Sequence, residues 1–86
     1  MPMSDTPAPV LLAEGTVCQV DVINRELVLL VDGARVVIDV PPDCQILLRG
    51  ERVRLRVVQP RDRARVTYAI RRGRPVAHSI DVRAGC

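Results

Sequence analysis

The chain has 86 residues, which is enough for one domain with a thin hydrophobic core. Its 48% apolar content is almost entirely aliphatic, because Phe and Trp are absent and Tyr68 is the only aromatic residue. No run approaches the roughly 20 apolar residues of a transmembrane helix, so we expect no membrane association. The net charge of +3 comes from thirteen basic residues, all arginine, against ten carboxylates.

Residues 1–13 are predicted to form a flexible N-terminal arm, because Met1–Pro9 contains three prolines among small polar residues. A basic segment followed by an apolar stretch is missing there, so we expect no secretory signal. We place the folded domain at residues 14–83 and a short tail at 84–86.

The first half of the domain has the pattern of three strands joined by short turns. Thr16–Ile23 alternates between apolar and polar residues with two breaks in parity, which indicates a bulge. Asn24-Arg25 is a candidate two-residue hairpin turn before the apolar strand Glu26–Val31. Asp32-Gly33 is the strongest hairpin signal in the chain, and it precedes the third strand, Arg35–Val40.

The second half begins with a short apolar segment, Cys44–Leu48, and a turn. Val53–Val58 starts with alternation and loses it, which indicates a short strand that leads into an irregular or single-turn connection. Ala64–Ile70 and Pro75–Val82 are the last two strands, joined at a hairpin loop over residues 71–74. No segment has helical periodicity, and short strands with turn signals predict an all-β, five- or six-stranded antiparallel OB-like barrel.

Several motifs of turn and core residues support this fold. A Gly-x-Val-x-x-Val-Asp pattern and a Leu-x-Gly turn are matched by Gly15, Val17, Val20 and Asp21, and by Leu48, Arg49 and Gly50. A Leu-x-x-Gly-Asp-x-Val-x-Val-x-Tyr pattern is matched loosely by Pro60, Asp62, Val66 and Tyr68. A final Val-Ala-x-x-Ile-x-Val pattern is matched by Val76, Ala77, Ile80 and Val82. Through these motifs the chain resembles a family of small bacterial OB-fold-like β-barrel domains of uncharacterised function. Arg61 departs from the family pattern, which has Gly at this position. A positive φ there would cost about 1 kcal/mol or more.

Catalytic machinery is not recognisable in the sequence, and we expect neither enzyme activity nor a cofactor. The single histidine, His78, has no nucleophile or carboxylate at a diagnostic spacing. A copper-binding OB-type barrel would need Met, His or an aromatic residue on its strands. Both methionines lie in the N-terminal arm and Trp is absent, so no metal site is predicted.

Three cysteines exclude a closed set of intrachain disulfides, and they lack metal-binding spacing. They are predicted to be reduced thiols of a cytoplasmic protein, two of them in the core. A pair between Cys18 and Cys44 stays open, and the terminal Cys86 is expected to be exposed.

The charges are distributed unevenly along the chain. Residues 1–48 hold two arginines and seven carboxylates, a net charge of −5, whereas residues 49–74 hold ten arginines and two carboxylates, a net charge of +8. The arginine usage itself fits either recognition of phosphate and carboxylate or the codon bias of a GC-rich genome. The candidate binding residues for a nucleic acid or an acidic partner are Arg52, Arg54, Arg56, Arg63, Arg65, Arg71, Arg72 and Arg74.

These observations leave two function classes open. The first is a non-enzymatic interaction module that works through protein contacts, including self-association of the acidic half of one copy with the basic half of another. The second is binding of RNA or single-stranded DNA by a basic face, which Arg52, Arg54 and Arg56 would share if that stretch is extended. The lack of aromatic stacking platforms weighs against the second class, because Tyr68 has the parity of a core residue.

Overall fold

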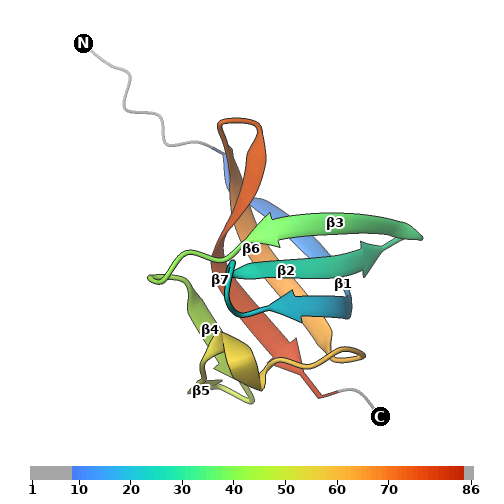
Figure 1. Cartoon of the computed structure of the whole chain (residues 1–86), viewed down its shortest axis with the longest axis vertical. Helices are drawn as coiled ribbons and strands as arrows, with labels where there is room; N and C mark the ends of the chain where they lie inside the picture. Colours follow the sequence, from blue (N-terminus) through green and yellow to red (C-terminus); the bar gives the residue numbers. More distant parts are fainter. Residues whose placement is uncertain (1–8, 85–86) are drawn as a thin grey trace.

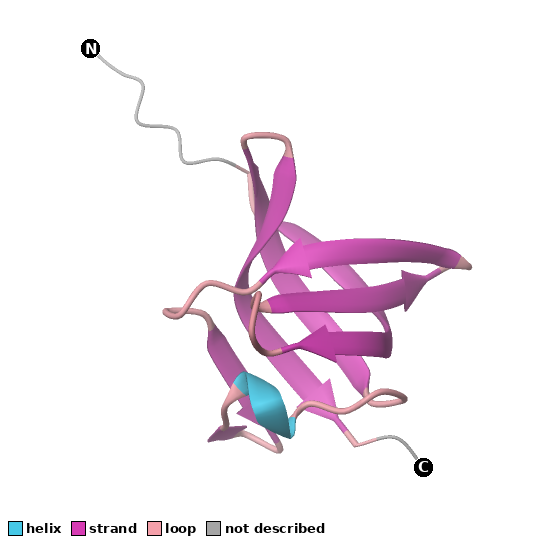
Figure 2. Cartoon of the chain, in the orientation of Figure 1, coloured by secondary structure: helices cyan, strands magenta, loops and turns pink. Residues whose placement is uncertain are grey.

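The structure is a computed structural model that describes residues 9–84, so Met1, Met3, Cys86 and most of the expected N-terminal arm lie outside the described residues. Seven strands and one turn of 3₁₀ helix follow each other along the chain (Figures 1 and 2). The elements are β1 (Leu11–Asp21), β2 (Glu26–Val31), β3 (Ala34–Asp39), β4 (Gln45–Leu48), β5 (Glu51–Arg52), η1 (Leu55–Val57), β6 (Arg63–Arg71) and β7 (Arg74–Arg83).

Five of the strands close into a barrel, as predicted. They follow the order β3-β2-β1-β6-β7, and a parallel contact between Asp39 of β3 and Val76 of β7 completes the ring. The second half of β7 pairs in parallel with β4, which extends the sheet and carries β5 at its edge. The segment between β3 and β6 therefore forms a small flap of β4, β5 and η1 at one end of the barrel (Figure 1).

Strand β1 belongs to two parts of the barrel wall. Its first half, from Leu11, pairs with β6, and its second half, from Thr16, pairs with β2. The strand therefore begins before the expected domain boundary at residue 14. Gly15 lies at the change of partner, where a Cβ atom would collide with the backbone carbonyl of Leu30. The motif glycine is explained by this close approach of two strands.

The expected bulge in β1 is present between Val17 and Gln19. Cys18 occupies it and is only half-buried, whereas Val17 is 1% exposed. The prediction of Cys18 as a core residue is therefore wrong, because the bulge reverses the parity of the strand. Cys44 is buried in the core as expected, and both cysteines are free thiols.

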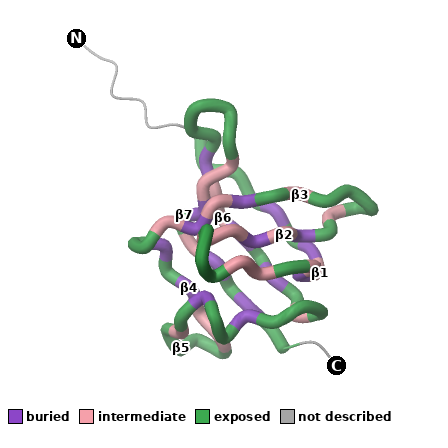
Figure 3. Tube along the Cα trace, viewed as in Figure 1, coloured by how far each residue is buried: buried purple, intermediate pink, exposed green. Residues whose placement is uncertain are grey.

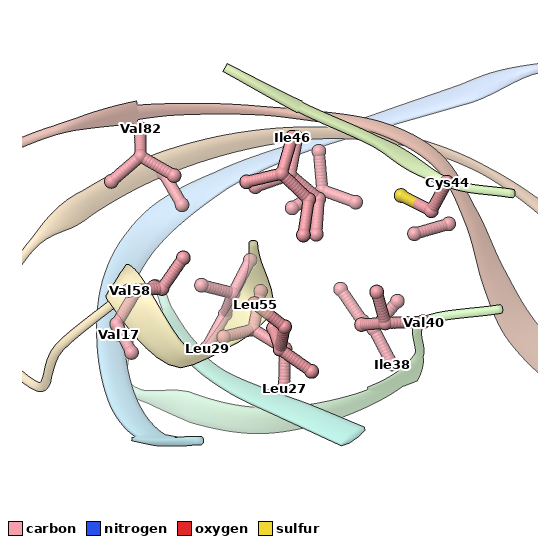
Figure 4. Packing of buried hydrophobic residues seen from close by; sticks show 14 of the residues in the cluster. Val17, Leu27, Leu29, Ile38, Val40, Cys44, Ile46, Leu55, Val58 and Val82 are labelled. Atoms are coloured by element: carbon pink, nitrogen blue, oxygen red, sulfur yellow. The ribbon is translucent and has the colours of Figure 1, made fainter. Parts of the chain in front are cut away.

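The core is aliphatic and fills the barrel interior (Figures 3 and 4). Leu27, Leu29 and Ile38 of the β2–β3 hairpin are fully buried. Leu55 of η1 belongs to the same cluster, so the flap contributes to the core and closes one end of the barrel. Tyr68 packs against this cluster, in agreement with its predicted parity.

Three hairpin turns use a residue followed by Gly, both with positive φ: Asp32-Gly33, Arg49-Gly50 and Arg72-Gly73. This is the type I′ geometry expected at Asp32-Gly33. The β1–β2 turn differs from the prediction, because Asp21 pairs with Glu26 and leaves four residues in the loop rather than two.

Candidate functional site

An open groove of about 420 Å³ lies between the β1–β2 turn and the flap of β4, β5 and η1. We call it the arginine groove. Its lining residues come from distant parts of the sequence, and they are Val22, Arg25, Pro42, Cys44, Ile46, Arg52, Val53, Arg54, Leu55 and Arg56. Four of the ten are arginines and none is a carboxylate, so the groove is strongly positive.

One of the four arginines is held in place by the backbone. Arg25 Nε donates a hydrogen bond of 2.8 Å to the carbonyl oxygen of Val40, and its Nη2 donates to that of Pro41 at 3.4 Å. The backbone carbonyl of Arg25 accepts a hydrogen bond from the Val40 amide at 2.9 Å. The Arg25 guanidinium is therefore fixed before any ligand arrives, which reduces the entropy lost on binding.

The other three arginines are exposed, and none forms an ion pair with another described residue. The alternation predicted that these three arginines share one face of an extended strand, and the structure differs from this prediction. Arg52 is in β5, Arg54 is extended at the start of η1, and Arg56 is inside this helical turn. Leu55 is 2% exposed, so its side chain enters the core while those of its two neighbours stay outside in the groove.

The remaining candidate arginines lie elsewhere. Arg65 of β6 forms an ion pair of 3.2 Å with Glu14, and Arg63 lines the same small cleft. Arg71, Arg72 and Arg74 occupy the β6–β7 hairpin tip as expected, at the opposite end of the molecule from η1 (Figure 1). A single basic face is therefore absent from the described part of the chain, and the eight candidates divide into three surfaces.

The outer face of strands β1, β2 and β3 carries three carboxylates at one end. Asp21, Glu26 and Asp39 are neighbours across the three strands and form an acidic row. Arg74 neutralises part of this row, with distances of 3.4 Å to Glu26 and 2.9 Å to Asp39. On small OB barrels the equivalent of this face binds single strands together with the adjoining loops. The carboxylate row therefore disfavours nucleic-acid binding on the strand part of this surface.

His78 and Cys44 line a second cavity, of about 150 Å³, which shares Cys44 with the arginine groove. His78 is exposed on β7, and burial raises the pKa of the Cys44 thiol from 9.0 to about 11. No group of three or more His, Cys, Asp or Glu residues that could hold a metal ion occurs within residues 9–84. Within the same range no helix is long and apolar enough to cross a membrane.

No protein-family model matches the sequence, and a search of curated proteins gave no match. Solved structures of CusF from Escherichia coli share the fold. Residues 6–88 of apo-CusF superpose with a TM-score of 0.73 at 15% identity, over 93% of this chain and 94% of that chain. Residues 10–88 of CusF with Ag(I) give a TM-score of 0.73 at 13% identity, over 92% and 98% of the two chains. At these identities the likeness establishes the fold, an OB-type β-barrel.

The comparison changes two expectations. The structural neighbours form a small-barrel group whose function is known in part, since CusF is solved with Ag(I) and Cu(II). The cytoplasmic location expected from the sequence is wrong by this comparison, because CusF is a periplasmic protein.

Proposed function

We propose that the chain is a non-enzymatic binding module that holds an anionic segment of a partner protein in the arginine groove. The observation that carries this proposal is the set of four arginines around one groove with no carboxylate among its lining residues. The planar guanidinium group donates paired hydrogen bonds to a carboxylate, which makes an acidic peptide a suitable ligand. The groove volume of about 420 Å³ is within the usual range of ligand sites.

A metal function like that of CusF does not fit the described residues. Cu(I) and Ag(I) favour thiolate, thioether and imidazole ligands. The described residues contain one histidine, which is exposed, and two cysteines, one of them buried with a raised pKa. These groups form no cluster of three potential ligands within residues 9–84, so we do not extend metal binding to this chain.

Fluorescence anisotropy tests the proposed function. The probes are a labelled ten-residue peptide of alternating Glu and Ser and a labelled single-stranded oligothymidylate of the same length. We expect the peptide to bind at 50 mM salt, to weaken as salt rises, and to bind more tightly than the oligonucleotide.

The decisive variant replaces Arg52, Arg54 and Arg56 by Ala and should weaken peptide binding by roughly 10- to 100-fold, because three charge-assisted contacts are lost. A matched control replaces Arg63, Arg71 and Arg72 by Ala. It removes the same net charge away from the groove, and we expect a change of less than about threefold from the weaker long-range attraction alone. Equal losses in the two variants, or no peptide binding at 50 mM salt, would contradict the proposal. Tighter binding of the oligonucleotide would assign the chain to the nucleic-acid class instead.

A further inference from the structure

The most exposed large apolar side chain in the described structure is at the tip of the β1–β2 turn, beside the arginine groove. Ile23 is 92% exposed, and the preceding Val22 is 44% exposed. The turn that carries them is well fixed. The Asp21 carboxylate accepts hydrogen bonds from the Asn24 amide at 3.0 Å and from its Nδ2 at 2.9 Å. Ile23 is therefore presented to solvent by a defined loop.

The surface around Ile23 continues into the arginine groove. An open depression on the other side of the turn shares Arg25 and Pro42 with the groove. Ile23 and Pro41 also line it, together with Glu26 and Asp39, which are both paired with Arg74. We call Val22, Ile23, Pro41 and Pro42 the apolar shelf. One partner segment that crosses Arg25 would therefore contact the shelf at one end and the three free arginines at the other.

From this juxtaposition, and on the basis of the proposed function, we infer that the partner is an amphipathic acidic segment. Its carboxylates lie in the arginine groove, and an aliphatic side chain next to them packs on Ile23. Charge complementarity selects the acidic part, since the groove offers four guanidinium groups and no carboxylate. The apolar part follows from the shelf, because a partner that covers Ile23 removes its side chain from water.

The arginine groove and the apolar shelf contribute differently to recognition of the partner. Exposed arginines alone attract any polyanion, and that attraction weakens with salt. An aliphatic contact is insensitive to this screening and discriminates between acidic segments that differ only in their apolar residues. The shelf has no aromatic residue on which a base could stack, so it favours a peptide over a single-stranded nucleic acid.

The test compares two labelled ten-residue peptides with equal charge, one alternating Glu with Leu and one alternating Glu with Ser. We expect the Leu peptide to bind the wild-type chain about 10-fold more tightly. The variant Ile23→Ser should remove this preference and leave binding of the Ser peptide unchanged. The control Ile70→Ser changes an isoleucine that is 47% exposed on β6 and should leave both affinities unchanged.

Equal binding of the two peptides to the wild-type chain, or a Leu preference that persists in Ile23→Ser, would overturn the inference while the proposed function stands. Absence of binding by either peptide would instead refute the proposed function. Light scattering without peptide tests whether a second copy of the chain occupies this surface. A wild-type dimer that Ile23→Ser dissociates would overturn the inference. A urea titration should give equal midpoints for Ile23→Ser and wild type, because the replaced side chain is almost fully exposed.

Discussion

Replacing Arg61 by glycine should stabilise the protein. Arg61 is the third residue of the Gln59–Asp62 turn, in which the Asp62 amide donates to the Gln59 carbonyl at 3.1 Å. Pro60 is second in this turn, and Arg61 has φ of 80°, as the third residue of a type II turn requires. The motif that the sequence resembles has glycine at this position, and the structure gives the physical reason, because only glycine adopts this φ without steric strain.

The strain cannot relax locally, because the turn is clamped to β1. The Arg61 amide donates to the Val17 carbonyl at 2.8 Å, and the Val17 amide donates to the Asp62 carbonyl at 2.8 Å. A left-handed conformation costs a non-glycine residue about 1–2 kcal/mol. Glycine adds about 0.5–1 kcal/mol of backbone entropy to the unfolded chain. The expected net gain from Arg61→Gly is therefore roughly 0.5–1 kcal/mol, or a rise in Tm of about 3–6 °C for a domain of this size.

Far-UV circular dichroism in a urea titration measures this difference. Arg61→Ala is the matched reference, because it removes the same charge and keeps the strained φ. We expect Arg61→Gly to exceed Arg61→Ala by roughly 0.5–1 kcal/mol in free energy of unfolding. A second control, Arg54→Gly, changes an arginine with φ of −89° and should lower stability, since it adds unfolded-state entropy without relieving strain. If Arg61→Gly is no more stable than Arg61→Ala, the strain argument is refuted.

Three further changes test the fold. Gly15→Ala should destabilise the protein by about 3 kcal/mol in urea titrations, because its methyl group meets the Leu30 carbonyl, whereas Gly33→Ala has free space and should cost only about 1 kcal/mol. Arg74→Ala should lower the free energy of unfolding by about 0.5–1 kcal/mol at low salt and less at 1 M salt, since it leaves two carboxylates on neighbouring strands unpaired. Cys44 should react with iodoacetamide at pH 8 about 100-fold more slowly in the folded than in the urea-unfolded chain, because burial raises its pKa from 9.0 to about 11. Peptide mass spectrometry measures the two rates, and equal rates would contradict its burial.

The barrel was predictable because its signals are local. Asp32-Gly33 specifies a type I′ turn, and the aliphatic run of β2 is short and bounded by turn residues, which favours a strand. The parallel contacts of β7 with β3 and β4 were not predicted, since they join residues far apart in the sequence. The four-residue β1–β2 loop was also missed, because it is stabilised by the Asp21 side chain rather than by a turn dipeptide.

The site was predictable only in part. The alternation of Arg52, Arg54 and Arg56 placed three basic residues together, although the reason given, an extended strand, was wrong for η1. Arg25 was missed as a groove residue because it belongs to the acidic half of the chain. Its proximity to the flap depends on the closure of the barrel, for which a single sequence has no signal. The same holds for Ile23, which looked like an ordinary strand residue.

The uneven charge along the sequence is partly neutralised in the folded barrel. Every ion pair within residues 9–84 joins an arginine of the basic half to a carboxylate of the acidic half: Arg65 to Glu14, and Arg74 to Glu26 and Asp39. The barrel lays β6 and β7 beside β1 and β3, so part of the opposite charge is neutralised within one molecule. The arginine groove, which Arg52 and Arg54 of the flap line, has no carboxylate among its lining residues. The groove therefore keeps the positive charge of its arginines available to a partner, whereas Arg74 at the hairpin and Arg65 on β6 are paired with carboxylates of the same chain.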